Sequence, residues 1–535
     1  MEQFQIYLIL FGVVVIVGQI FKKSSVPLSL QLVVTGMCLS FLPHFPHITL
    51  NPELVLNIFL PILIYQISSF SSWKDIKKHV RPIAMLSIGH VIFITLLVAI
   101  VIHMLLPQLG WPLAFVLGAV ISPPDDVAIV SIAEKIRMPA RIVTILEGEG
   151  MLNDATALLL FRFALAAVAT HEFSVIHLTT TFTVLIIVET LYGLLIGYII
   201  GELRTHIHNS SLHMIASILT PFIAYFPAEM LGGSGILATA ATGFIIGQFY
   251  SLRFSPEFRL FSWAFWPSLS FALQNIIFLL VGLNLRFIIN NISSIPTASL
   301  LLYSVSVILV VILGRFIWMF PTVYLPRVFA SVRKKEAAFP WQFPIVISWA
   351  GMRGGVSLAA ALAVPSLPFT VAGANPRDLL IFLVFSVIVA TFLLQGLTLP
   401  WLLKVLKVQK YSRCEQYNEH VAELIARMTM VKAVLRWLSK YKNVSNDPKL
   451  LDEIKVHILQ YQMLKKQLKT KIAREAETLI SDEKTAIITE VFLLSQIIEI
   501  EKAELLRLWH SEKINLAVRN KLLERLDHRA KHLTV

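Results

Sequence analysis

The stretch LEGEGMLNDATALLLF, residues 146–161, decides the fold, because it places Glu149, Asn153 and Asp154 inside a run that otherwise has the composition of a membrane helix. An ionised side chain at the centre of a bilayer costs several kcal/mol, about 2.5 to 3.5 on insertion scales. Membrane proteins therefore keep such residues where a partner compensates the charge or where a function uses it. These three residues are the first candidate functional residues of the chain.

The composition of the whole chain is that of a multi-span membrane protein. Of its 535 residues, 56% are hydrophobic and only 15% are charged, and the mean hydropathy is +0.73, whereas about a quarter of the residues in soluble domains are charged. The net charge of +13 does not indicate a nucleic-acid partner, because no nucleic-acid-binding motif accompanies it. The two cysteines match no metal spacing, and we expect no cofactor.

Apolar stretches of about 20 residues predict membrane-spanning helices. Thirteen such stretches occur, near residues 5–21, 27–42, 50–68, 82–106, 111–133, 143–168, 180–202, 212–228, 233–249, 264–289, 298–324, 341–365 and 378–404.

The loops between these stretches predict the orientation. Connections that follow odd-numbered spans hold sixteen Lys or Arg residues, whereas those that follow even-numbered spans hold almost none, with Arg377 the clear exception. The positive-inside rule then places the N-terminus outside and the C-terminus in the cytoplasm. From residue 409 the pattern changes to charged amphipathic helices. We therefore expect a transmembrane domain, 1–408, and a cytosolic helical domain, 409–535.

Two of the predicted spans are interrupted at mid-membrane. The fifth contains SPPDD, residues 122–126, where Pro123 and Pro124 remove two helix donors. The twelfth contains GMRGG, residues 351–355, whose glycines weaken the helix around Arg353. The twelfth span comes seven positions after the fifth, an odd number, so the two segments cross in opposite directions, as an inverted repeat requires. Paired interruptions of this kind indicate the midplane site of a secondary transporter.

Asp154 is the predicted carrier residue. A carboxylate withdrawn from water holds a proton more readily, so a proton and a metal cation can compete for it near neutral pH. One acid with two alternative ligands and two access states is a complete exchange mechanism. Asp125 and Asp126 at the first break would supply further carboxylate oxygens, together with freed backbone carbonyls, as ligands for a small cation. The alternative is that Asp154 is permanently paired with an arginine.

Two arginines within the predicted spans need counter-charges. Arg315 lies at the depth of Glu149, so we predict a buried ion pair between them that holds the sixth span in place. Arg353 lies at the crossing of the interrupted spans, where its charge would offset the carboxylates when the cation is absent.

Five further polar residues lie within spans. Gln274 and Asn275 are expected to form hydrogen bonds between helices. Glu189 has no assigned partner, and a lipid-contact or dimer-face role is as plausible as a functional one. His90 and His103 are expected to be packing or interfacial residues, because no nucleophile motif accompanies them and a membrane-embedded hydrolase would need one. A cation channel, the other rival, would need a continuous polar path, whereas these polar residues cluster.

The motifs resemble those of the sodium/proton exchangers of the cation/proton antiporter superfamily. The stretch ISPPDDVAIVSIAEKIRMPARIVTILEGEGMLNDATALLLF is followed in order by SGILATAATG, GRFIWMFP, GMRGGVSLAAALAVP and QGLTLP, and the resemblance runs from about residue 5 to 408. It implies an all-α polytopic protein of thirteen spans with two crossed broken helices, and a homodimer in which a six-helix core moves against a dimerisation domain. It also implies Na⁺/H⁺ antiport and pH homeostasis in a bacterial inner membrane, with Na⁺, H⁺, the lipid bilayer and a second copy as partners.

The resemblance also implies residue roles. Asp154 matches the ion-binding carboxylate, and Asn153 matches the asparagine that marks the electroneutral branch. Asp125 matches the acid of the first broken helix and Arg353 the arginine of the second. Glu149 matches one member of the family's structural ion pair, whose other member matches Arg315.

The chain departs from the family at four positions. Pro124 stands where the family has threonine, Asp126 where it has proline, and Gly150 where many members have serine. Gln66 replaces an acidic residue common in the third span, and we keep it among the candidate ion-binding residues. The sequence thus leaves the choice among Na⁺, Li⁺ and K⁺ open, with K⁺/H⁺ or Li⁺/H⁺ antiport as the alternatives.

Overall fold

The computed structural model describes residues 3–22, 26–42, 50–125, 138–170, 175–325, 339–371, 373–442 and 448–480. Apart from an isolated bridge between Val371 and Ala374, the secondary structure of these residues is helical. The chain divides into two compact units, Met1–Gln409 and Lys410–Val535, which are described separately below.

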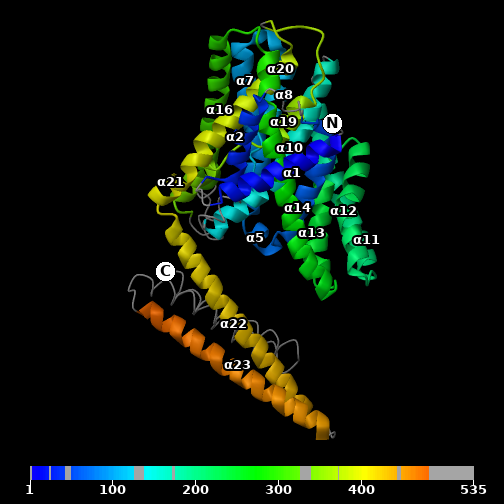
Figure 1. The fold of residues 1–535 in the computed structure, drawn as a ribbon, viewed down its shortest axis with the longest axis vertical. Coiled ribbons are helices and arrows are strands. Elements are labelled where there is room, and N and C mark those ends of the chain that lie inside the picture. Colours follow the sequence, from blue (N-terminus) through cyan, green and yellow to red (C-terminus); the bar gives the residue numbers. More distant parts are fainter. Residues whose placement is uncertain are drawn as a thin grey trace. The chain divides into compact units, whose positions relative to one another are not determined.

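The first unit is a bundle of helices (Figure 1). In chain order its elements are α1 (Gln3–Ile20), α2 (Leu28–Ser40), α3 (Pro52–Leu54), η1 (Val55–Phe59), α4 (Leu60–Phe70), α5 (Trp73–Lys78), α6 (Val80–Ala84), η2 (Met85–His90), α7 (Val91–Leu105), η3 (Pro107–Leu109), α8 (Gly110–Ile121), α10 (Ala140–Thr170), α11 (Val175–Thr205), α12 (Ser210–Met230), α13 (Ile236–Ile245), η4 (Ile246–Tyr250), α14 (Pro256–Leu283), α15 (Leu285–Asn291), α16 (Thr297–Tyr324), α18 (Gln342–Trp349), α19 (Gly355–Leu362), α20 (Pro376–Thr391), η6 (Phe392–Gly396) and α21 (Leu397–Val405).

These helices confirm a polytopic all-α membrane protein. Within the described residues, eight helical stretches are long and apolar enough to cross a membrane, and four shorter apolar helices accompany them. Together with the interrupted pair α18 and α19, they account for the thirteen predicted spans. In the fifth span, α8 ends at Ile121, and the predicted remainder from Asp126 onward lies outside the described residues.

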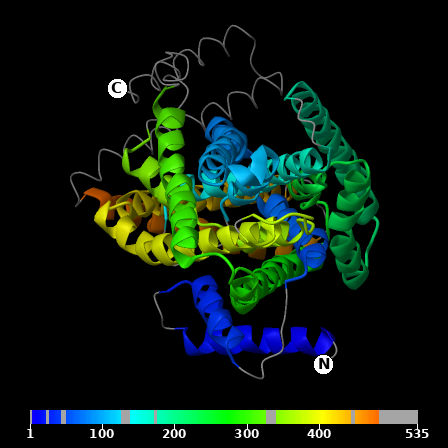
Figure 2. The same cartoon turned by 90° about the horizontal axis from the view of Figure 1, so that it is seen from above.

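The helices of this unit pack as two groups. The first, which we call the site group, comprises α7, α8, α10, α16, α18, α19 and α20. The second, the flanking group, comprises α1, α2, α4, α11, α12, α13 and α14. Figure 2 shows α1 and α2 in dark blue along one edge of the unit, where they pack beside α14. The two groups meet where α10 contacts α4 and α13 and where α19 contacts α14.

Close glycine contacts hold the flanking group together. A Cβ added to Gly282 of α14 would lie 2.9 Å from the Cα of Gly36 on α2, and one added to Gly193 of α11 would lie 2.7 Å from the Cα of Ala238 on α13. Real side chains do not approach so closely, so glycine at these positions lets the helix backbones touch. Small residues at such contacts are the usual basis of tight packing between membrane helices.

The two interrupted spans meet at their breaks. Residues 122–125 follow α8 without helical structure, and residues 350–354 separate α18 from α19. The backbone N–H of Asp125 donates a hydrogen bond of 2.7 Å to the carbonyl oxygen of Met352. The predicted crossing of the broken helices is therefore present, and a main-chain hydrogen bond joins the two breaks.

Several spans contain wide π-helical turns, which the apolar pattern did not predict. In η2, the carbonyl of Met85 accepts a hydrogen bond of 2.9 Å from the indole N–H of Trp318 on α16. Gly89 in the same turn leaves the space that this indole occupies. Wide turns of this kind release backbone carbonyls and are frequent near functional sites.

In the second unit, α22 (Gln409–Lys442) and α23 (Pro448–Ile480) pack against each other. The buried contact is apolar and consists of Leu424, Met428, Val431 and Leu468, with Leu435, Tyr461 and Ile472 at its margin. This agrees with the amphipathic pattern of the first tail segment. The later amphipathic stretch, beyond residue 480, lies outside the described residues.

Candidate functional site

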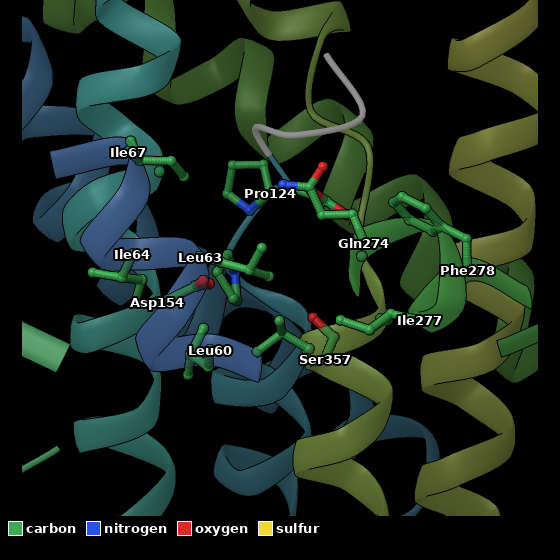
Figure 3. A pocket seen from close by; sticks show the side chains of 16 residues that line it. Leu60, Leu63, Ile64, Ile67, Pro124, Asp154, Gln274, Ile277, Phe278 and Ser357 are labelled. Carbon is green, nitrogen blue, oxygen red and sulfur yellow. The ribbon is translucent and has the colours of Figure 1, made fainter. Parts of the chain in front are cut away.

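A cavity of about 50 Å³ lies between the site group and the flanking group. This volume is enough for several water-sized species. Figure 3 shows Asp154 entering it beside Leu60 and Leu63, with Gln274 and Ser357 across the space. Its lining residues come from α4, α10, α14, α19 and the two breaks: Leu60, Leu63, Ile64, Ile67, Pro123, Pro124, Asp125, Gly150, Asp154, Gln274, Ile277, Phe278, Gly354, Gly355, Val356 and Ser357.

Asp154 reaches this cavity from α10 and is partly exposed to it. Gly150, one helical turn earlier, lines the same wall, because residues four apart share a helix face. Among the residues that the structure describes, Asp154 forms no ion pair, so the alternative of a permanent arginine partner is wrong within that part of the chain.

Asp125 shares the cavity with Asp154, and Asn153 connects their two segments. The side-chain amide of Asn153 donates a hydrogen bond of 3.0 Å to the carbonyl oxygen of Pro124. Asn153 is fully buried and is not among the lining residues. Its contact instead holds the first break beside α10, one residue from Asp154.

The other predicted ligands have different outcomes. Gln66 is not among the lining residues, and Asp126 lies outside the described residues. Gln274 lines the cavity, whereas Asn275 donates a hydrogen bond of 2.6 Å to the carbonyl of Phe271 in its own helix. Among the described residues, the expected interhelical bond of Asn275 is therefore absent. Ser357 also lines the cavity, although it is not among the residues predicted from the sequence. Its position two residues after the glycines of the second break could have identified it as a candidate.

The predicted contact between Glu149 and Arg315 is present. Arg315 of α16 donates two hydrogen bonds to the Glu149 carboxylate, at 2.7 and 2.8 Å, and both side chains are about 98% buried or more. The Arg315 Nε donates a third hydrogen bond of 3.1 Å to the carbonyl of Ile347 in α18. Gly351 leaves space for the Arg315 side chain, since a Cβ there would lie 2.5 Å from its Cδ. Arg315 thus joins α10, α16 and α18.

Arg353 lies in the second break, fully buried. Its backbone N–H donates a hydrogen bond of 3.2 Å to the hydroxyl oxygen of Thr391 on α20, and its Nη1 donates one of 3.2 Å to the carbonyl of Gly351. Within the described part of the chain it forms no ion pair. The guanidinium is therefore a buried positive charge beside the crossing, outside the cavity wall.

The histidines lie away from the cavity wall. His90 is fully buried in η2. His103, near the end of α7, stacks on Trp111 with ring centroids 4.2 Å apart. Neither residue lines the cavity.

Glu189 is buried, so the lipid-contact and dimer-face interpretations of this residue are wrong. Its carboxylate accepts hydrogen bonds from the backbone N–H of Ser234, at 2.5 Å, and from the Ser234 hydroxyl, at 3.1 Å. Ser234 lies in the turn just before α13, where backbone donors lack helical partners. A carboxylate at a helix N-terminus is stabilised by those donors and by the helix dipole.

Arg162 of α10 binds to the same turn before α13. Arg162 donates hydrogen bonds to the carbonyl of Gly233 and, at 2.7 Å, to the carboxylate of Glu229 at the end of α12. We call this pair of contacts the Arg162 tie. Arg162 lies eight residues beyond Asp154, about 12 Å farther along α10 by helical rise. The tie therefore crosses between the two helix groups, on the side of Asp154 opposite to Gly150.

The Glu149–Arg315 pair predicts a large effect of removing one partner. Glu149→Gln leaves Arg315 buried without a counter-charge, which costs about 3–5 kcal/mol for pairs of this kind. We expect a marked fall in the thermal unfolding midpoint of the purified protein. The matched control is Arg253→Gln, which breaks the exposed pair with Glu202 and is expected to change the midpoint little.

The double variant Glu149→Met with Arg315→Met removes both charges and should recover part of the loss. If Glu149→Gln unfolds at the temperature of the Arg253→Gln control, the pair does not hold α10.

Comparison with known proteins identifies the family of this chain. Residues 9–405 match the family model described as "Sodium/hydrogen exchanger, transmembrane". A "Sodium, potassium, lithium and rubidium/H(+) antiporter" of Bacillus pumilus is 31% identical over 392 residues, which cover 70% of this chain and 58% of the relative. An uncharacterized Na(+)/H(+) exchanger of Mycobacterium bovis is 33% identical over 445 residues, covering 80% of each chain.

A solved structure has a similar fold. The sodium proton antiporter MjNhaP1 of Methanocaldococcus jannaschii, at pH 8, superposes with a TM-score of 0.58 and 18% identity over 75% of this chain and 98% of that chain. This likeness concerns the fold, and the family model and the relatives carry the assignment. The chain therefore belongs to the sodium/hydrogen exchanger family, whose members are transporters and not enzymes.

Proposed function

We propose that the chain is a secondary active transporter that exchanges Na⁺ for H⁺, with Asp154 binding the two in alternation. The observation that carries this proposal is the position of Asp154, which reaches a largely apolar cavity and has no ion-pair partner among the described residues. Glu149, five residues earlier on the same helix, is fully engaged by Arg315. The helix thus carries one neutralised carboxylate and one available for cargo.

Electroneutral exchange follows from the charge of this carboxylate. Either a proton or a monovalent cation neutralises Asp154, so the loaded site has the same net charge with both cargoes. Asp125 lines the same cavity and would add carboxylate oxygens for a cation, which is a hard ion that favours oxygen ligands. Exchange of one Na⁺ for one H⁺ then moves no net charge across the membrane.

The setting that fits this function is a bacterial inner membrane, with the N-terminus outside and the C-terminus in the cytoplasm. The asymmetry of Lys and Arg between loops supports this orientation. The bacterial origin of the relatives supports a bacterial membrane as the location. A homodimer formed through the flanking group is part of the same proposal, since exposed apolar residues on α1 and α11, such as Val15 and Leu191, offer a surface for lipid or a second copy.

A broader choice of cation is the second candidate. The relative from Bacillus pumilus is named for sodium, potassium, lithium and rubidium. In this chain the cavity contains Gly150 and lacks Gln66, so it has few fixed oxygen ligands that would enforce one ionic radius. Exchange of K⁺ or Li⁺ for H⁺ is therefore an explicit outcome of the experiment below.

Transport is tested with purified protein in proteoliposomes that carry a preset pH gradient and an internal pH dye. We expect added Na⁺ or Li⁺ to collapse the gradient at a rate that clamping the membrane voltage does not change. Asp154→Asn should reduce this flux to the level of protein-free vesicles. Glu202→Gln, in the exposed pair with Arg253, is the control and should transport normally.

Each other result has a defined meaning. Response to K⁺ alone keeps the mechanism and changes the cation. A cation current that needs no proton gradient and does not saturate indicates a channel. Flux that persists in Asp154→Asn contradicts the role of Asp154 and directs attention to Asp125.

Exchange also requires that the site be accessible from each side of the membrane in turn. We propose that the Arg162 tie closes the site on one side. The cavity separates α4 from α10 at Gly150 and Asp154. Farther along α10, the tie joins this helix to the end of α12 and the turn before α13. If the site group moves against the flanking group during exchange, this contact has to open when access changes sides.

A reversible cross-link tests this requirement. In a chain with Cys38 and Cys414 replaced by serine, Arg162→Cys with Glu229→Cys is joined by a bifunctional thiol reagent of matching length. Exchange should stop after cross-linking and recover after reduction. The control is Glu202→Cys with Arg253→Cys, a pair that lies outside the contact between the two groups. Full-rate exchange by the cross-linked 162–229 protein contradicts the proposed movement.

A further inference from the structure

Two adjacent glycines at the second break face different neighbours. A Cβ added to Gly354 would overlap the carboxylate of Asp125, lying 2.5 Å from its Cγ and 2.7 Å from its Cβ. A Cβ added to Gly355 would instead overlap the γ2 methyl group of Ile277 and lie 3.3 Å from the Cγ2 of Val281, both on α14. One glycine thus adjoins the candidate ion site, and the other adjoins the flanking group.

Glycine is required at position 354 because a larger residue would clash with Asp125, and not because of its backbone conformation. Its φ of −112° and ψ of −178° are extended backbone values that any residue adopts. The side chain of Asp125 cannot rotate out of the way, because its own Cβ lies within the excluded distance. Its backbone cannot move freely either, since its N–H is bonded to the carbonyl of Met352, two residues before Gly354. Any side chain at position 354 must therefore separate the two breaks or displace the Asp125 carboxylate.

The requirement at position 355 concerns the contact between helix groups. Gly355 is the first residue of α19 in the site group, and Ile277 belongs to α14 in the flanking group. Both residues also line the cavity. Added bulk here would push α19 away from α14 without touching the carboxylate of Asp125.

We propose that Gly354 is the positioning residue that sets the Asp125 carboxylate in the cavity and thereby determines the discrimination among monovalent cations. Gly355 determines the close contact at which α19 moves against α14, and so the rate of exchange. Discrimination among cations of different radius depends on the number of oxygen ligands and on the size of their cavity. This inference rests on the proposed cation/proton exchange.

The test compares Gly354→Ala with Gly355→Ala in the proteoliposome assay. For each variant, half-saturating concentrations and maximal rates are measured for Na⁺, Li⁺ and K⁺. We expect Gly354→Ala to raise the half-saturating concentration of the preferred cation roughly 10- to 100-fold, the usual effect of losing a group that orients a ligand, and to change the order of the three cations. Gly355→Ala should lower the maximal rate and preserve that order.

Two double variants test the assigned contacts. Ile277→Ala removes the methyl group that a Cβ at position 355 would overlap, so it should restore the rate of Gly355→Ala. In a chain that already carries Asp125→Asn, adding Gly354→Ala should produce little further change in cation order, because two changes that act through one group are not additive.

Contrary outcomes are equally defined. An unchanged cation order in Gly354→Ala, or the same change of order in Gly355→Ala, overturns the inference. If Gly354→Ala does not fold, Asp125→Asn decides, since an unchanged cation order in that variant also overturns it. The wild type is measured first: if it exchanges no cation for protons, the proposed function fails, and this result is distinct from a failure of the glycine variants.

Discussion

The bidentate ion pair between Glu149 and Arg315 is the interaction on which the arrangement of the site depends. Two buried charges are tolerable only when each satisfies the other and the remaining donors find acceptors, and the third hydrogen bond of Arg315 to Ile347 meets that condition. The pair fixes the height and rotation of α10 relative to α16 and α18. One turn farther along the same face, Asn153 binds the carbonyl of Pro124. The face that carries Glu149 and Asn153 is thus held in place, and the adjoining face presents Gly150 and Asp154 to the cavity.

The same logic explains why much of the site could be predicted from sequence. In a membrane span each charged residue is costly, so each one carries information that an equivalent surface residue in a soluble protein lacks. Depth along the spans was sufficient to pair Glu149 with Arg315. The prolines and glycines at the two breaks were sufficient to predict that the interrupted helices cross, because they remove or weaken helical hydrogen bonds at known positions.

Other contacts depend on helix rotation and local backbone shape, which depth does not determine. Gln66 lies on a cavity-forming helix but outside the cavity wall, and a change of one residue is enough to turn a side chain by about 100°. Glu189 accepts hydrogen bonds from the backbone N–H and the hydroxyl of Ser234 in the turn before α13, a contact that depth along the spans does not predict. The π-helical turn η2 likewise lies where the indole of Trp318 packs against the helix from α16.

The strength of the Arg162 tie depends on the medium on its side of the membrane. Its ion pair is partly exposed, with 36% of the Arg162 side chain and 27% of the Glu229 side chain accessible to solvent. Dissolved salt screens exposed charges over a Debye length of about 10 Å at 0.1 M and about 3 Å at 1 M. A saline medium therefore weakens the ionic half of this contact, while the hydrogen bond to the Gly233 carbonyl is affected far less. If this contact opens during exchange, as proposed, the balance between the two access states then depends on ionic strength, in addition to any effect of the cation as cargo.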